Sequence, residues 1–254
     1  MQSDFLRVAL QAAEAAAEII KPLYQSNVEV RTKADKSPVT VADVEAEKRI
    51  RALLEENFPT HGFYGEETGE RGRDAEYLWL VDPIDGTKAF VREYPMFSTQ
   101  IALMHRGELI VGVSSAPVYG ELAYAEKGRG AWLNGHQVKV SAIDELEDCS
   151  VSAGNLKSLA RSKRWQAYGE IVGRVDRIRG YGDFLHYHLL VSGRIDAVLE
   201  SDVNILDIAA LACIVEEAGG RFTDLQGKPV GLDIDSVLAT NGLLHGPLLQ
   251  ALAH

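Results

Sequence analysis

The first 60 residues carry two helical patterns of apolar side chains. Residues 3–24 predict a helix that Ser3 caps and that holds Pro22 in its last turn. The apolar stripe of this helix is expected to comprise Phe5, Leu6, Leu10, Ala13, Ala17 and Ile20. After a polar stretch at residues 31–38, residues 40–57 predict a second helix, which Pro59 stops. Its buried positions are expected to be Val44, Ile50, Leu53 and Leu54.

Short apolar runs replace the helical spacing further along the chain. Residues 65–67 form a loop in this interpretation, and residues 77–81 predict a short buried strand. Asp82-Pro83 is expected to end that strand, because proline has no N–H for a ladder. Further strands are predicted at residues 99–104, 108–114 and 122–126, and Asn134-Gly135 is a strong hairpin signal.

Strand and helix patterns alternate after residue 148. Strands are predicted around residue 151, at residues 175–178 and 195–199, around residue 222, and at residues 237–240. Helices are predicted to begin near Lys157, Asp183 and Asn204, and Gly219-Gly220 ends the last of them. We therefore expect an N-terminal α+β lobe at residues 1–145 and a C-terminal α/β lobe at residues 146–254, with an interface between them.

Composition and charge describe a globular chain and exclude some partners. Of 254 residues, 46% are apolar and 25% are charged, which is enough to bury a large core. The net charge of -11 repels phosphate backbones, so nucleic acid is not an expected partner. Cys149 and Cys213 lack metal-site spacing and are expected to be reduced. Arg7, Glu14 and Glu18 interrupt the apolar N-terminal segment, so we expect a cytoplasmic protein without a membrane span.

The stretch at residues 78–87 carries the clearest chemical signal. A buried strand delivers Asp82 and Asp85 to its carboxyl end, and Gly86-Thr87 then opens a helix. Mg²⁺ prefers oxygen ligands of this kind, and bound cations would give an acidic protein the positive charge that an anionic substrate needs. An ordinary Asx-turn, in which both acids only bind backbone N–H groups, is the alternative interpretation.

Other acids each have a structural alternative when they are considered alone. Glu66 and Glu67 fit an exposed acidic loop. Thr40 and Asp43 fit the capping pattern at the start of the second helix. Asp207 fits the favourable interaction of an acid with a helix N-terminus.

Together these residues resemble the inositol monophosphatase superfamily of metal-dependent phosphatases. The matching segments are residues 37–43 (SPVTVAD), 65–67 (GEE), 79–87 (WLVDPIDGT), and 207–220, which begins DIAA and ends EAGG. The resemblance implies a fold of the α/β (α+β) class with alternating helix and sheet layers. This is the αβαβα sandwich of the inositol monophosphatase and fructose-bisphosphatase type, with the site between the two lobes.

The resemblance also implies a metal site that joins both halves of the chain. Glu66, Asp82 and the carbonyl of Ile84 would hold one Mg²⁺. Asp82, Asp85 and Asp207 would hold a second, with Asp82 bridging the two ions. Two or three Mg²⁺ ions are expected, with Mn²⁺ as an alternative. Such a site stabilises the attacking and leaving oxygens of a phosphate ester without a protein nucleophile.

The catalytic residues that the resemblance implies are Asp43, Thr87 and Glu66. Asp43 and Thr87 would orient the attacking water, and the backbone N–H groups of Gly86 and Thr87 would bind the substrate phosphate. Because a protein that only binds its ligand has no need to activate water, this pair favours a hydrolase over a metal-dependent phosphosugar-binding protein. The expected partner is a small phosphate ester, and a homodimer is expected.

The substrate is predicted from two further acids. Glu200 matches the position that contacts substrate hydroxyls in inositol-specific members. Asp183 stands at the start of a helix where those members usually carry a small or hydroxyl residue, and the pattern Gly182-Asp183-Phe184 looks like the histidinol-phosphate phosphatases. An acidic wall suits the ammonium and imidazole of histidinol. The alternative is that Asp183 only caps its helix.

Inositol-1-phosphate and 3′-phosphoadenosine 5′-phosphate remain as alternative substrates. Arg177 and Arg179 are the only nearby candidates for binding an adenine nucleotide, and they fit surface charges equally well. His186 and His188 lie two apart on a helix and point in different directions, so we interpret them as structural and not as a metal pair.

Overall fold

A computed structural model of the chain describes residues 2–26, 30–32 and 38–253. Ser37, the first residue of the first matching segment, lies outside the described residues. A short two-stranded sheet, β1 (Val30–Thr32) with β2 (Pro38–Thr40), precedes the second helix.

The N-terminal half forms an eight-stranded sheet in the order β10-β9-β8-β7-β6-β5-β3-β4. Its strands are β3 (Gly62–Gly65), β4 (Gly69–Arg71), β5 (Tyr77–Asp85), β6 (Ser98–His105), β7 (Glu108–Ala116), β8 (Glu121–Glu126), β9 (Ala131–Leu133) and β10 (His136–Val138). All neighbouring pairs are antiparallel except β3 with β5. The predicted hairpin at Asn134-Gly135 is confirmed, since both residues have the positive φ, 50° and 77°, that such a turn needs.

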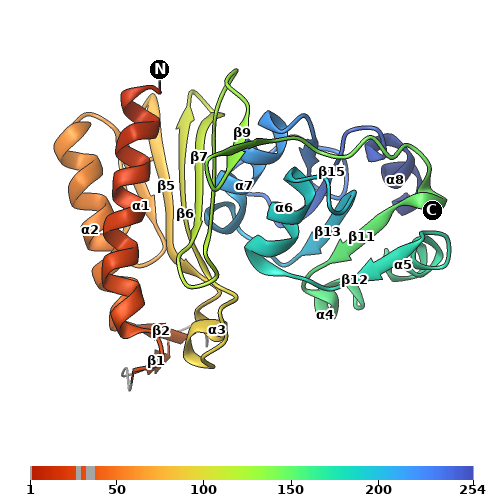
Figure 1. Cartoon of the computed structure of the whole chain (residues 1–254), viewed down its shortest axis with the longest axis horizontal. Helices are drawn as coiled ribbons and strands as arrows, with labels where there is room; N and C mark the ends of the chain where they lie inside the picture. Colours follow the sequence, from red (N-terminus) through yellow and green to blue (C-terminus); the bar gives the residue numbers. More distant parts are fainter. Residues whose placement is uncertain (1, 27–29, 33–37, 254) are drawn as a thin grey trace.

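Two helices, α1 (Asp4–Leu23) and α2 (Val41–Asn57), cover one face of this sheet (Figure 1). Leu6, Ala13 and Ile20 of α1 are buried as expected. Phe5, Leu10 and Ala17 are only partly buried, because the centre of the stripe lies elsewhere. The residues at that centre are Ala9, Ala12 and Ala16, whose small side chains let the helix approach its neighbours closely.

The C-terminal half forms a five-stranded sheet in the order β12-β11-β13-β15-β14. Its strands are β11 (Ser150–Ala153), β12 (Arg177–Arg179), β13 (Ala197–Ser201), β14 (Arg221–Thr223) and β15 (Ser236–Thr240). The helices of this half are α4 (Leu156–Leu159), α5 (Trp165–Val172), α6 (Asp183–Val191), α7 (Ile205–Glu217) and α8 (His245–Leu252). A short helix, α3 (Thr87–Val91), belongs to the first half, and a 3-10 turn at Leu146–Asp148 leads into the second.

Three apolar cores separate the layers of the fold. The first lies between α1, α2 and the eight-stranded sheet; the second surrounds α6 and α7 between the two sheets; the third lies between the five-stranded sheet and α4, α5 and α8. Figure 1 shows this order from the N-terminal helices to the C-terminal ones. The predicted αβαβα sandwich is confirmed. The division into lobes at residue 145 stays a prediction.

The prediction that Asp82-Pro83 ends its strand is wrong, because β5 continues to Asp85. Its antiparallel register with β6 shifts between Asp82 and Asp85, so Pro83 is not required to donate to the ladder. The carbonyl of Pro83 instead accepts a hydrogen bond from the Thr99 hydroxyl at 2.8 Å. Strands β3 and β4 and helix α8 were not predicted. No helix in the described part of the chain has both the length and the apolar character of a membrane span.

Candidate active site

The alternation of side chains along β5 decides where its acids point. Leu80 packs into the core around α7, whereas Val81 packs on the opposite face beneath α1 and α2. Asp82 is therefore directed toward α7, whose first turn carries Asp207. Oxygens of Asp82, Asp85 and Asp207 lie within 4.8 Å of one another. The fold thus brings Asp207 to Asp82 and Asp85, which precede it by more than 120 residues in the sequence.

Asp207 is held in this cluster by a capping box at the start of α7. Its two carboxylate oxygens accept from the backbone N–H of Asn204 at 2.9 Å and from the Asn204 side-chain amide at 2.8 Å. The structure therefore supports the helix-terminal interpretation of Asp207 as well as its place beside the β5 acids. One residue serves both purposes.

Burial and the repulsion between neighbouring carboxylates raise the pKa values of Asp82, Asp85 and Asp207. Burial, and then the carboxylates of Glu66, Asp85 and Asp207, raise the pKa of Asp82 well above its ordinary value. Burial, and then Asp207, likewise raise the pKa of Asp85. Burial raises the pKa of Asp207 to about 7, against the hydrogen bonds from Asn204. Clustered carboxylate oxygens are a donor set that suits hard divalent cations, so these residues fit a site for such an ion.

Glu66 reaches this cluster from the turn between β3 and β4. Its backbone N–H donates to the carbonyl of Val81 at 3.2 Å, which extends the parallel pairing of β3 with β5. Its carboxylate lies close enough to Asp82 to raise the pKa of that acid. The carboxylate therefore adjoins the residue with which the resemblance pairs it.

Asp43 combines the capping and the catalytic interpretations. One carboxylate oxygen accepts from the backbone N–H of Thr40 at 2.8 Å and from its hydroxyl at 2.6 Å, which forms the capping box of α2. The other oxygen accepts from the Thr87 hydroxyl at 3.0 Å. Burial raises the pKa of Asp43, while the hydrogen bonds from Thr40 and Thr87 lower it. Asp43 of α2 is thus joined to Thr87 at the start of α3, the pair that the resemblance implies.

The turn at residues 84–87 requires glycine at position 86. Gly86 has φ 90°, and a Cβ there would lie 2.6 Å from the carbonyl oxygen of Met96. The Ile84 N–H donates to Asp82 at 2.9 Å, and the Ile84 carbonyl lies 3.1 Å from the Thr87 hydroxyl. The close approach of this backbone places the first residues of α3 beside the acidic cluster.

Glu200 is buried on β13 and is held by two side chains of α6. One of its oxygens accepts from the Tyr187 hydroxyl at 2.8 Å and lies 3.2 Å from Nε2 of His186. Gly154 leaves the space for the other oxygen, because a Cβ there would approach it to 2.1 Å. The roles of Tyr187 and Gly154 were not predicted from the sequence, and His186 was interpreted only as structural. No local pattern reports these contacts between separate elements.

Asp183 is the first residue of α6, and the structure does not support its interpretation as the helix cap. Gly182 occupies the N-cap position, and no side-chain hydrogen bond caps the helix there. Burial, and then Glu200, raise the pKa of Asp183 to about 6, while His186 lowers it. Asp183 and Glu200 also raise the pKa of Asp85. The two acids therefore lie near the β5 cluster.

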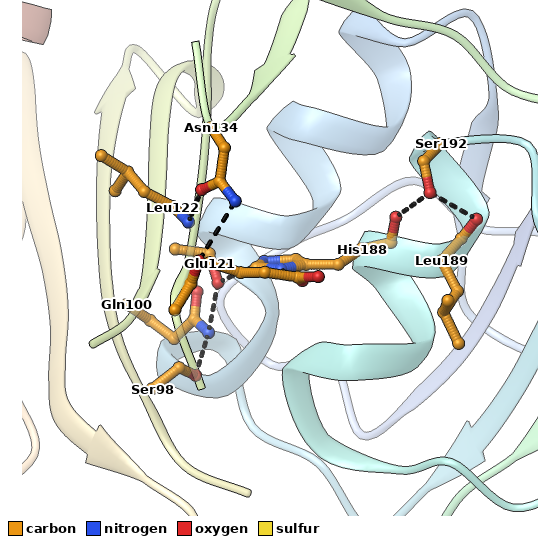
Figure 2. Close-up of polar contacts among 10 residues, drawn as sticks. Ser98, Gln100, Glu121, Leu122, Asn134, His188, Leu189 and Ser192 are labelled. Carbon is orange, nitrogen blue, oxygen red and sulfur yellow. Dashed lines mark hydrogen bonds and ion pairs between the residues drawn. The ribbon is translucent and has the colours of Figure 1, made fainter. Parts of the chain in front are cut away.

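His188 points to the other side of α6 and ties it to the eight-stranded sheet (Figure 2). Its Nδ1 lies 2.8 Å from a Glu121 oxygen and its Nε2 lies 2.9 Å from the Ser114 hydroxyl. Ser114 in turn accepts from the side-chain amide of Gln100, the register partner of Asp82. Burial lowers the pKa of His188, so a neutral ring suits this network. His186 and His188 have separate partners, in agreement with their interpretation as unpaired.

The two arginines considered for nucleotide binding lie on an edge strand. Arg177 and Arg179 of β12 are exposed, and the Arg179 guanidinium donates to the backbone carbonyl of Ile178 at 2.7 Å. Both fit the interpretation as surface charges.

Comparison with known proteins identifies the family. A sequence model described as the inositol monophosphatase family matches residues 1–254. A histidinol-phosphatase of Mycobacterium tuberculosis is 39% identical, over 99% of both chains. An inositol-1-monophosphatase of Mesorhizobium japonicum is 33% identical, over 98% of this chain and 96% of that one. The crystal structure of the extragenic suppressor protein suhB from Bartonella henselae superposes with a TM-score of 0.89 at 33% identity, over 98% of each chain. The chain belongs to the inositol monophosphatase family of phosphatases.

Proposed function

We propose that this phosphatase hydrolyses histidinol phosphate to histidinol and phosphate, with Mg²⁺ as its cofactor. The observation that carries the substrate proposal is the pair of acids, the partly buried Asp183 and the buried Glu200, beside the Asp82, Asp85 and Asp207 cluster. Burial and the neighbouring Glu200 make Asp183 costly to ionise, and a cationic leaving group would offset that cost. The name of the Mycobacterium tuberculosis relative agrees with this proposal.

In the proposed metal site, Glu66, Asp82 and the Ile84 carbonyl hold one Mg²⁺, and Asp82, Asp85 and Asp207 hold a second. A third, weaker ion and replacement by Mn²⁺ belong to the same proposal. When bound, the ions neutralise phosphate charge and lower the pKa of a coordinated water. The carboxylates position them, and Asp82 contributes to both groups.

The remaining proposed roles belong to groups around the phosphate. The Thr87 hydroxyl donates a hydrogen bond to Asp43, which leaves its oxygen free to accept a hydrogen bond from the attacking water and to orient it. The N–H groups of Gly86 and Thr87 bind the phosphate oxygens. Glu200, held by His186 and Tyr187, directs its other oxygen toward the alcohol part of the substrate, and Asp183 binds the ammonium group.

A comparison of three esters tests the substrate proposal. Phosphate release from histidinol phosphate, inositol-1-phosphate and 3′-phosphoadenosine 5′-phosphate is measured with Mg²⁺ and again with excess EDTA. We expect the highest kcat/KM for histidinol phosphate, and no release from any ester in EDTA. A higher kcat/KM for inositol-1-phosphate would favour the activity in the name of the Mesorhizobium japonicum relative.

Asp43→Asn is expected to lower kcat by about 10²-fold or more, the usual contribution of a positioned acid–base group, while Mg²⁺ binding is retained. The asparagine side chain has one oxygen in place of two, so it cannot accept from both Thr40 and Thr87. The Thr87 hydroxyl therefore loses its fixed orientation. Steady-state kinetics give kcat, and titration calorimetry gives Mg²⁺ affinity. Thr87→Ala should slow the reaction similarly, and the double variant should be little slower than either single one. Loss of Mg²⁺ binding in Asp43→Asn would make Asp43 a direct ligand.

We also propose a homodimeric assembly and a cytoplasmic location. Sedimentation of the purified chain and fractionation of the producing cells test these two proposals separately.

A further inference from the structure

Glu47 is a fully buried acid of α2 that the proposed mechanism does not use. It lies one helical turn after Asp43, and its exposed fraction is 0%. Its two carboxylate oxygens accept from consecutive backbone N–H groups, one from Glu67 at 2.8 Å and one from Thr68 at 2.6 Å. Both donors belong to the turn that follows Glu66. The buried Glu47 carboxylate therefore binds two adjacent backbone N–H groups of one short segment.

Gly65 leaves the space that this carboxylate occupies. A Cβ at Gly65 would lie 2.5 Å from an oxygen of Glu47. This requirement explains why the turn begins with glycine directly before Glu66, since any larger residue would displace the carboxylate or the turn. Arg51, one further turn along α2, adds a hydrogen bond to the Thr68 hydroxyl at 3.2 Å.

The turn is consequently fixed on both sides of Glu66. Glu47 binds the N–H groups of Glu67 and Thr68, and the preceding N–H, that of Glu66, donates to the carbonyl of Val81 in β5. With three consecutive N–H groups at residues 66–68 bound, the backbone of Glu66 has little freedom, and its side chain is left beside Asp82. The face of α2 that contacts Thr87 through Asp43 thus also contacts the turn at residues 66–68 through Glu47.

We propose that Glu47 is a positioning residue that holds the turn at residues 66–68 so that the Glu66 carboxylate is preorganised as a metal ligand. The inference rests on the proposed function only for the role of Glu66. Groups that orient a ligand in this way commonly change metal affinity by about 10-fold to 100-fold when they are replaced. A carboxylate suits the task because each of its oxygens can accept one N–H, whereas an amide offers one acceptor and places a donor against the other N–H.

The test is Glu47→Gln, with Glu56→Gln on the same helix as the matched control. Glu56 is exposed and lies far along α2 from the turn. Mn²⁺ binding to the full chain is measured without substrate, from the electron paramagnetic resonance of free Mn²⁺. We expect Glu47→Gln to weaken one class of Mn²⁺ site by about 10-fold to 100-fold and to leave the other within about twofold. In assays, the Mg²⁺ concentration for half-maximal activity should rise by the same factor, and saturating Mg²⁺ should restore kcat.

Glu66→Gln separates failure of this inference from failure of the proposed site. If Glu66→Gln weakens Mn²⁺ binding and Glu47→Gln does not, Glu47 serves only the fold and the inference is wrong. If neither substitution changes Mn²⁺ binding, the assignment of Glu66 as a ligand fails first. A loss of thermal stability in Glu47→Gln with unchanged Mn²⁺ affinity would also overturn the inference.

A measurement on the wild-type protein covers the case in which Glu47→Gln does not fold. Amide hydrogen exchange at Glu67 and Thr68 should be slow in the metal-free chain, because both N–H groups are bound to a buried carboxylate. Exchange as fast as that of Gly107, which is exposed in the turn between β6 and β7, would contradict the proposed restraint.

Discussion

Asp82→Asn is expected to lower phosphate release by about 10³-fold or more at any Mg²⁺ concentration. Asp82 is the acid that both proposed ions share, and an amide supplies no charge to either. A loss of about 4 kcal/mol of transition-state stabilisation, the several kcal/mol expected of metal catalysis, corresponds to a factor of about 10³. The amide keeps the oxygen that accepts from the Ile84 N–H, so the turn at residues 84–87 should persist.

The same substitution should raise thermal stability in EDTA, which separates a metal site from a structural acid. Burial and neighbouring carboxylates raise the pKa of Asp82 in the folded protein, so its charge destabilises the fold above that pKa, and removing the charge stabilises it. Mg²⁺ should raise the melting temperature of the wild type and leave that of Asp82→Asn nearly unchanged. Full activity of Asp82→Asn in excess EDTA would refute the mechanism.

Asp207→Asn provides the graded comparison. It removes charge from one proposed ion only, so we expect a higher Mg²⁺ requirement with partial recovery of kcat at saturation. Circular dichroism checks that α7 survives the loss of one capping hydrogen bond from Asn204.

Asp183→Asn is expected to lower kcat/KM for histidinol phosphate by about 10-fold to 150-fold and to change that for inositol-1-phosphate much less. A charge-assisted hydrogen bond contributes about 1.5 to 3 kcal/mol, and each 1.4 kcal/mol is a factor of ten. A neutral polyol offers no ammonium for such a bond. Asparagine is preferred to alanine because Asp183 has φ 45°, a left-handed conformation that asparagine tolerates.

The ratio of the two kcat/KM values is the decisive measurement, because effects on the shared phosphate cancel in it. Asp176→Asn serves as the matched control, since Asp176 is exposed in the loop before β12. Equal losses toward both esters would assign Asp183 a general role in the site and remove the main physical support for histidinol phosphate as the substrate.

The sequence by itself determined the features that depend on near neighbours. The capping box of Thr40 with Asp43, the buried run before Asp82 and the hairpin at Asn134-Gly135 each follow from residues a few positions apart. The motifs also indicated which acids lie close together, since the resemblance implied which positions along the chain carry the metal ligands. Residue type and spacing are sufficient for such features because their energies arise within one turn of helix or one ladder.

Only the tertiary structure decided how separate elements complete one another. The continuation of β5 through Pro83 depends on a register shift against β6, which no property of residues 82–83 alone can specify. Glu47 looks like an ordinary polar helix position until β3 brings the turn at residues 66–68 against it. Glu200 likewise acquires its partners from α6. The physical reason is that a buried polar group is placed by whichever distant donors satisfy it, and these become neighbours only when the layers pack.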